Sequence, residues 1–206
     1  MIPIPSLIMP VRPSFIFDML NQEAHRPPFQ LPVPVRTSGS PTLLEQCLLL
    51  AVARIVKPNA KHGIFEFGTF RGATTFTLAL NFPDATIDTL DLDPSQSNGL
   101  LEHLPAVQRW KGHSLTFDLD PHKAGIGSAK SLIFIDGGHD YRTAQSDTRN
   151  ALEMLRTDAP AAIVWHDYNQ AAWPGVTKAV DEFAQDHHTY SIEETNLAVS
   201  FQGEGA

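Results

Sequence analysis

Two short apolar runs, each followed closely by histidine and aspartate, constrain this chain of 206 residues more than any other feature. The runs are Leu132–Ile135 and Ala161–Trp165. Uninterrupted apolar runs of this length are typical of strands buried on both faces, as in a parallel sheet. In such sheets ligands bind beyond the carboxyl ends of the strands. We therefore expect the polar residues after the two runs to lie together at a ligand-binding edge: Asp136, His139, Asp140, His166 and Asp167.

Strand and helix signals alternate along most of the chain. The alternation predicts a parallel sheet with helices on both faces, and a terminal hairpin adds one antiparallel strand. The expected strands cover residues 63–67, 86–91, 107–111, 130–135, 161–165, 189–193 and 197–201. Helices are expected from Ser40, which would be the N-cap before Pro41, over 74–81, around 97–104, before Gly127, over 142–155 and over 174–185.

The first 39 residues differ from the rest because they hold half of the chain's 16 prolines. Proline removes a backbone donor and disfavours helix in the residue before it. We expect an irregular arm over 1–39, with one short helix near Ser14–Gln22, followed by a single domain over 40–206. The arm is too apolar for a disordered tail, so packing against the domain is favoured. The alternatives are a lid over the substrate site and a contact between two copies in a homo-oligomer.

Composition excludes several classes of partner. The net charge of −8, without a cluster of Lys and Arg, argues against nucleic acid. No apolar segment is long enough to span a membrane, and the N-terminus lacks the pattern of a secretion signal, so a cytoplasmic location is expected. The single cysteine, Cys47, fits a reducing compartment. It lies in an apolar stretch, which favours a buried thiol over a nucleophile.

A glycine-containing turn follows the first predicted strand of the domain. Gly68 and Gly72 allow a tight turn and a close approach of the backbone to a ligand. Asp91 ends the next strand, 23 residues after Gly68, where an acid commonly binds ribose hydroxyls in nucleotide-binding units. The spacing is not that of a dinucleotide site. Glu66, two residues before the turn, favours a cationic or amine-bearing ligand over a pyrophosphate.

The motifs taken in order resemble the class I S-adenosylmethionine-dependent methyltransferases, and most closely the small-molecule branch called methyltransferase domain 24. They are Glu66-x-Gly68-x-x-x-Gly72, Leu90–Pro94, Gly112–Ser114, Phe134–Tyr141, His166–Tyr168 and Pro174–Val180. The resemblance covers the chain from about residue 40 to its end. It implies a Rossmann-like α/β fold with a seven-stranded sheet in the order 3-2-1-4-5-7-6, in which strand 7 is antiparallel.

The resemblance also implies S-adenosylmethionine as cofactor and a small-molecule acceptor, methylated on a hydroxyl oxygen. Glu66 and Gly68 would face the methionine end of the cofactor, and Asp91 would bind the ribose. His113 stands where this family often has an acid near the adenine, and Ser114 would supply part of that contact. The expected cofactor-binding residues are Glu66, Gly68, Thr69, Gly72, Asp91, Leu92, His113, Ser114 and Asp136.

Related branches bind a divalent metal such as Mg²⁺ or Mn²⁺ after strands four and five. The matching positions are Asp136, His166 and Asp167. Because Mg²⁺ prefers oxygen ligands, His166 would favour Mn²⁺, Fe²⁺ or Zn²⁺, or leave the site without metal. His139 occupies the place of a catalytic lysine in metal-dependent relatives, and a neutral histidine can accept a hydroxyl proton. We therefore expect His139 and Asp136 to be catalytic; the structural alternative is that Asp136 only caps a turn.

Two other functions remain open. Two histidines and a carboxylate also suit a metal-dependent hydrolase or oxygenase, although that function leaves the glycine turn and Asp91 unexplained. A non-catalytic cofactor-binding module is the other alternative. Retention of Glu66, Gly68, Gly72 and Asp91 argues against it, because a lost site would tolerate replacement at any of these positions.

Overall fold

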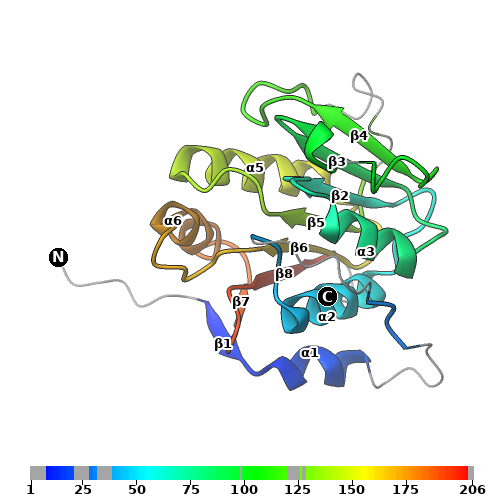
Figure 1. Ribbon diagram of the computed structural model, residues 1–206. Helices are drawn as coiled ribbons and strands as arrows, with labels where there is room; N and C mark the ends of the chain where they lie inside the picture. Colours follow the sequence, from blue (N-terminus) through cyan, green and yellow to red (C-terminus); the bar gives the residue numbers. More distant parts are fainter. Residues whose placement is uncertain are drawn as a thin grey trace.

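The chain forms one eight-stranded sheet with helices on both faces (Figure 1). The computed structural model describes residues 8–20, 28–31, 39–97, 99–119, 126 and 129–203, and every structural statement below concerns this part of the chain. In chain order the elements are β1 (Met9–Val11), α1 (Pro13–Leu20), α2 (Leu43–Val56), β2 (Ile64–Phe67), α3 (Ala73–Asn81), β3 (Ile87–Asp91), the 3₁₀ helix η1 (Pro94–Ser97), β4 (Val107–Lys111), β5 (Leu132–Ile135), α5 (Tyr141–Met154), β6 (Ala161–Trp165), α6 (Pro174–Phe183), β7 (Tyr190–Ile192) and β8 (Ala198–Gln202).

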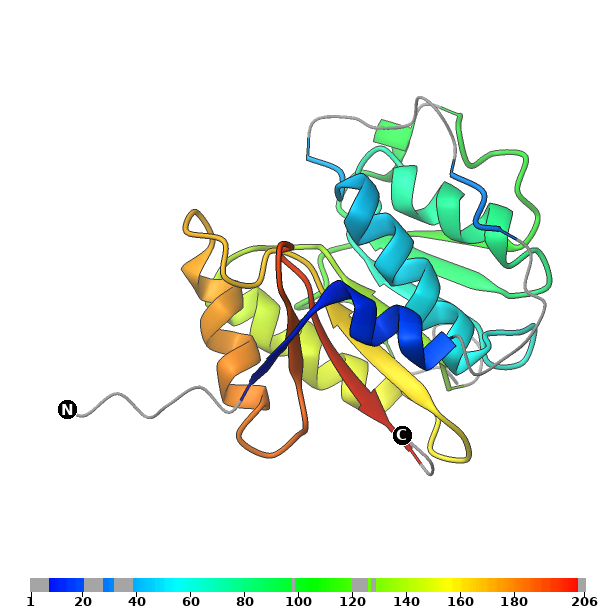
Figure 2. The same cartoon turned by 90° about the horizontal axis from the view of Figure 1, so that it is seen from below.

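The strand order is β1-β7-β8-β6-β5-β2-β3-β4. β2 to β6 are parallel, and β8 is antiparallel to both β6 and β7. Seven of these strands have the order and directions expected from the sequence, so the Rossmann-like fold is confirmed. The eighth strand was missed. β1 pairs in parallel with β7, with Met9 opposite Tyr190, and forms the edge of the sheet (Figure 2).

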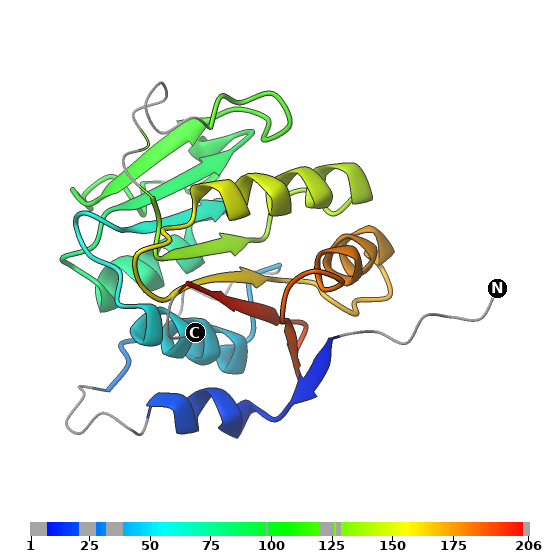
Figure 3. The same ribbon diagram turned by 180° about the vertical axis from the view of Figure 1, so that it is seen from behind.

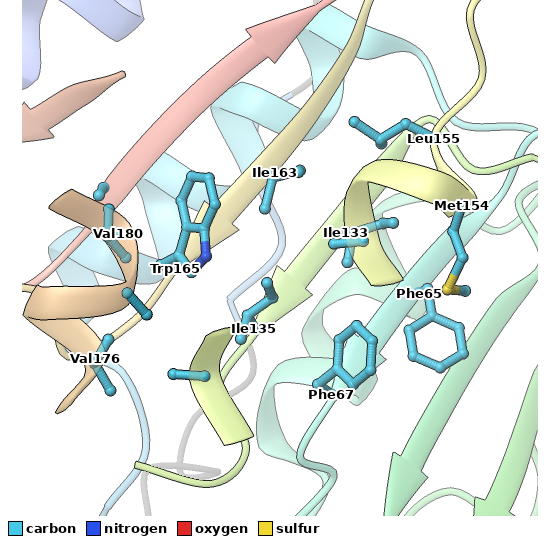
Figure 4. Close-up of a cluster of buried hydrophobic side chains, with 14 of the residues drawn as sticks. Phe65, Phe67, Ile133, Ile135, Met154, Leu155, Ile163, Trp165, Val176 and Val180 are labelled. Atoms are coloured by element: carbon cyan, nitrogen blue, oxygen red, sulfur yellow. The ribbon is translucent and has the colours of Figure 1, made fainter. Parts of the chain in front are cut away.

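Alternate residues of the central strands pack on opposite faces of the sheet. Phe65, Ile133 and Trp165 face α5 and α6, where they meet Met154 and Val180 (Figure 4). The intervening residues face α2 and α3 on the other side, and α1 packs outside α2 (Figure 3). Burial on both faces explains why these strands are continuous apolar runs. It also leaves the ends of the strands as the place for polar side chains.

Two helix predictions differ from the structure, and a third falls mostly outside the described residues. The helix expected from Ser40 begins at Leu43, because Thr42 and Glu45 form a reciprocal capping box at its start. The helix expected around 97–104 is replaced by the short η1 followed by turns. The helix expected before Gly127 falls mostly outside the described residues.

Two further expectations were that Cys47 is a buried thiol and that no segment spans a membrane. Cys47 is only partly buried, and burial raises the pKa of its thiol. Among the described helices, none combines the length and the apolar character that crossing a membrane requires.

Candidate active site

A cavity of about 770 Å³ runs along the carboxyl ends of the five parallel strands from β4 to β6. This volume is within the usual range for small-molecule sites. Parallel strands lie about 4.8 Å apart, so five of them span roughly 19 Å, enough for a nucleoside-sized ligand beside a second small molecule. Most of the expected site residues line the cavity: Gly68, Thr69, Asp91, Leu92, His113, Ser114, Asp136, His139, Asp140, His166 and Asp167.

Gly68 lets two loops of the site meet. Its φ of 92° lies in the left-handed region, and a Cβ at this position would lie 2.1 Å from the carbonyl oxygen of Asp136. No other residue fits both requirements. Gly72 is the N-cap of α3 and faces Leu101 instead of the cavity. The turn therefore depends on both glycines, but only Gly68 lies where a ligand would contact it.

Asp91 lies at the end of β3 and points an acceptor group at the cavity. Its Oδ2 accepts a hydrogen bond from the backbone N–H of Phe70 at 2.8 Å, and its Oδ1 accepts one from Asp93 at 2.8 Å. A carboxylate has about four acceptor sites, so capacity remains for two ligand hydroxyls. Asp91 thus fixes the turn after β2 and can bind a diol at the same time.

Glu66 does not line the cavity, contrary to its expected position at the methionine end. It is buried on β2, where its carboxyl group accepts hydrogen bonds from Thr75 and, at 2.6 Å, from Thr89. Burial raises its pKa to about 8, although the two threonines oppose the shift. Thr89 is in turn 2.7 Å from the hydroxyl of Thr69, which does line the cavity. Glu66 therefore reaches the site only through Thr89 and Thr69.

His139 is paired with an acid at the other end of the cavity. Its Nε2 lies 2.9 Å from Oδ2 of Asp167, and its ring stacks on Trp173 with centroids 4.3 Å apart. The hydrogen bond to Asp167 raises the pKa of His139 above 6.5, and partial burial opposes the shift. Asp167 itself adopts a φ of 60°, an uncommon conformation that is concentrated at functional sites. The geometry is that of a histidine base oriented by a carboxylate.

His166 is surrounded by three carboxylates. Its Nδ1 lies 3.2 Å from Asp136 and 3.4 Å from Asp167, and its Nε2 lies 3.5 Å from Glu45. Burial alone would lower the pKa of His166, but the three acids outweigh it and raise the pKa to about 12. The pKa of Glu45 falls to about 2, because its ion pair with His166 and the hydrogen bonds that it accepts from the backbone N–H groups of Asn196 and Thr42 outweigh burial. The three acids therefore favour the imidazolium form of His166 within the site.

The structure brings together a second set of possible metal ligands besides the expected one. Ligand atoms of Asp136, His139 and Asp167 all lie within 4.8 Å of one another. His166 lies beside them, with its Nδ1 3.2 Å from Asp136 and 3.4 Å from Asp167, so the expected ligands Asp136, His166 and Asp167 are also close together. The donor set of one imidazole nitrogen and two carboxylates has the composition of a divalent cation site.

Sequence reasoning missed two acids that line the cavity from helices, Glu45 on α2 and Asp147 on α5. The spacing of Thr42 and Glu45 is a capping-box signature and could have identified Glu45. Asp147 is a charged residue within the buried face of α5, a break in the helical pattern that points to a special environment.

The family of the chain follows from comparison with known proteins. A family model described as "Methyltransferase domain" matches residues 65–168, which is half of the chain and includes the turn after β2, Asp91 and the polar residues after β5 and β6. The chain belongs to this family. It is a class I S-adenosylmethionine-dependent methyltransferase, as the motifs predicted. No curated protein matches the chain.

Solved structures share the fold of this methyltransferase. CalS11, a TDP-rhamnose 3′-O-methyltransferase of calicheamicin biosynthesis, is 13% identical with a TM-score of 0.63, over 94% of this chain and 93% of that chain. TomG from Streptomyces achromogenes, solved with S-adenosylmethionine, is 17% identical with a TM-score of 0.58, over 93% and 89%. The O-methyltransferase from Bacillus cereus, solved with S-adenosylhomocysteine, is 16% identical with a TM-score of 0.60, over 92% and 91%.

Proposed function

We propose that this methyltransferase transfers the methyl group of S-adenosylmethionine to a hydroxyl oxygen of a small molecule. The observation that carries the proposal is one cavity with an expected ribose-binding acid, Asp91, at one end and the His139–Asp167 pair at the other. The structural neighbours named above are O-methyltransferases, which supports oxygen as the acceptor atom.

The residues at the β2 to β4 end fit the cofactor. Gly68 lets the loop after β5 approach the turn after β2 at the edge of the cavity, and Asp91 and Thr69 present acceptor oxygens to the cavity. When bound, S-adenosylmethionine supplies a methyl group on a sulfonium centre that is ready for displacement. The chain then has to position the acceptor and remove its proton.

His139 is placed to remove that proton. With its Nε2–H donated to Asp167, its Nδ1 carries the lone pair that accepts the hydroxyl proton. The carboxylate of Asp167 stabilises the imidazolium that results. Trp173, stacked on His139 and 42% exposed, offers an apolar wall for the acceptor beside the base.

A metal ion is not required in this mechanism. If a divalent cation is bound, Asp136, His139 and Asp167 would hold it, and it would lower the pKa of the acceptor hydroxyl. However, protonated His166, which lies between Asp136 and Asp167, already offsets part of the negative charge of these carboxylates. We therefore infer that His139 acts as a base and that excess chelator leaves turnover unchanged. Loss of turnover with EDTA, restored by Mn²⁺, would support the metal instead.

The proposal also covers the extent of the domain, the class of acceptor and the location of the protein. We infer that residues 40–206 carry the methyltransferase domain and that the arm over 1–39 packs against it, as Ile16 and Phe15 do against α2 and Tyr190. The net charge of −8 supports a small acceptor over nucleic acid, and the single cysteine supports a cytoplasmic location.

Calorimetric titration with S-adenosylhomocysteine tests the cofactor assignment. We predict micromolar binding by the wild type, and a loss of about 1–3 kcal/mol, or roughly 5- to 150-fold in affinity, in Asp91→Ala. Asp93→Ala is the matched control, because Asp93 is an exposed acid two residues further on that does not line the cavity. Absence of binding by the wild type at millimolar concentration would refute the proposed function.

A further inference from the structure

Asp147 is a buried acid that the mechanism does not use. Its side chain on α5 is completely buried, and neither carboxylate oxygen has a hydrogen-bond partner among the described residues. The Ser114 hydroxyl is close enough to oppose the burial that raises the pKa of Asp147 to about 7, but it does not complete a hydrogen bond of acceptable geometry. An unsatisfied buried polar group destabilises a fold, so such a group points to a ligand that would satisfy it.

The carboxylate belongs to the lining of the cavity that Asp91 and His113 also line, although its oxygens have almost no exposed surface. Asp147 and Ser114 both line this cavity, and Leu92, which is 63% exposed, adds an apolar wall. The loop after β5 passes over Asp147: a Cβ on Gly137 would lie 3.5 Å from its Oδ2, and a Cβ on Gly138 would lie 2.5 Å from Thr143. Gly137 therefore lies beside the carboxylate, whereas the space beside Gly138 is filled by Thr143.

We propose that Asp147 recognises the adenine of the cofactor by accepting a hydrogen bond from its exocyclic amino group. The assignment rests on the proposed function and names a specificity residue within the same site. The adenine edge carries a donor that matches the unpartnered acceptor, and Leu92 offers an apolar side chain in the same cavity for its flat face. Ser114, beside Asp147, can donate to the neighbouring ring nitrogen. On this assignment α5 supplies the acid that the loop after β4 lacks, since His113 stands there.

The stability of Asp147→Asn distinguishes a ligand-binding role of Asp147 from a purely structural one. If the Asp147 carboxylate has no partner until a ligand binds, replacing it with the neutral carboxamide removes an unsatisfied charge from the ligand-free protein. Asp147→Asn should then raise the Tm of that protein by about 2–4 °C. If the carboxylate braces α5 against the sheet, the same substitution should lower the Tm or prevent folding.

Binding of two ligands that differ at the amino group and at the adjoining ring nitrogen tests the proposal. We would titrate S-adenosylhomocysteine and S-inosylhomocysteine, in which oxygen replaces that group, into the wild type, Asp147→Asn and the exposed control Asp186→Asn. The wild type and the control should prefer the adenosyl ligand by about 10²–10³-fold, since the inosyl ligand places an oxygen where Asp147 accepts from the amino group and a ring N–H that cannot accept from Ser114. Asp147→Asn should reduce the preference to within about tenfold, because a carboxamide can also donate to oxygen.

Each outcome decides between the alternatives. Equal binding of both ligands by the wild type, an unchanged preference in Asp147→Asn, or a fall in its ligand-free Tm would overturn the role of Asp147 and leave the proposed function standing. Binding of neither ligand by the wild type would overturn the proposed function as well.

Discussion

At the scale of single residues, the environment of His139 sets the pH range in which the proposed base can act. Its hydrogen bond to Asp167 raises the pKa above 6.5, because the carboxylate favours the imidazolium, and partial burial opposes this only in part. A base works in its unprotonated form. Activity is therefore expected to be low below the raised pKa and to increase as the pH rises through it.

We predict that His139→Ala lowers kcat by about 10²–10⁴-fold and abolishes this ionisation, while the affinity for S-adenosylhomocysteine stays within about twofold. Asp167→Asn should shift the ionisation to lower pH, since it removes the main cause of the raised pKa. The measurements are pH–rate profiles and calorimetry, with the exposed His188→Ala as control. If His139→Ala keeps wild-type turnover, the base is another group; if it loses cofactor affinity and Tm together, His139 only braces the loop.

At the scale of elements, Glu66 connects β2 with α3 and β3 through Thr75 and Thr89. The folded protein holds the Glu66 proton up to about pH 8, whereas an ordinary glutamate releases it near 4.5. Between these values the folded state binds more protons than the unfolded state. The free energy of unfolding therefore falls as the pH rises, by up to about 1.4 kcal/mol per pH unit. Asp147, with its raised pKa, contributes in the same direction.

We predict that Glu66→Gln flattens this dependence, because the amide oxygen still accepts the threonine hydrogen bonds and nothing ionises. The variant should resemble the wild type near pH 5 and exceed it in stability near pH 8. Urea unfolding at intervals from pH 5 to pH 8 measures the effect, with the exposed Glu153→Gln as control. Parallel stability curves for Glu66→Gln and the wild type would contradict the raised pKa.

At the scale of the whole molecule, the sheet was predictable from the sequence because its central strands are buried on both faces. Runs such as Leu132–Ile135 are continuous and end in polar residues, which located most of the site. Glu45 and Asp147 were missed because they come from helices. Helical periodicity shows which residues share a face, but not which strand ends that face meets.

The edge strand β1 was missed for a related reason. It has three residues, includes Pro10, and pairs with β7 near the other end of the chain, so no local sequence pattern indicates a strand here. Proline is tolerated there because β1 is an edge strand. Together with α1, which packs on α2, β1 makes the described part of the arm continuous with the sheet and the helical layer.

Ile16 on α1 distinguishes packing of the arm from a lid. Its side chain is completely buried in the cluster formed with α2, and it does not line the cavity. We predict that Ile16→Ala lowers the free energy of unfolding by about 2–5 kcal/mol, with a fall in Tm of about 2–4 °C per kcal/mol, and leaves the affinity for S-adenosylhomocysteine unchanged. Met9→Ala, at a side chain that is 47% exposed on β1, should change neither quantity measurably. Urea unfolding and calorimetry on the same preparations measure both. A variant that kept its stability but lost ligand affinity would make the arm a lid, because only contact with the occupied cavity could produce that combination.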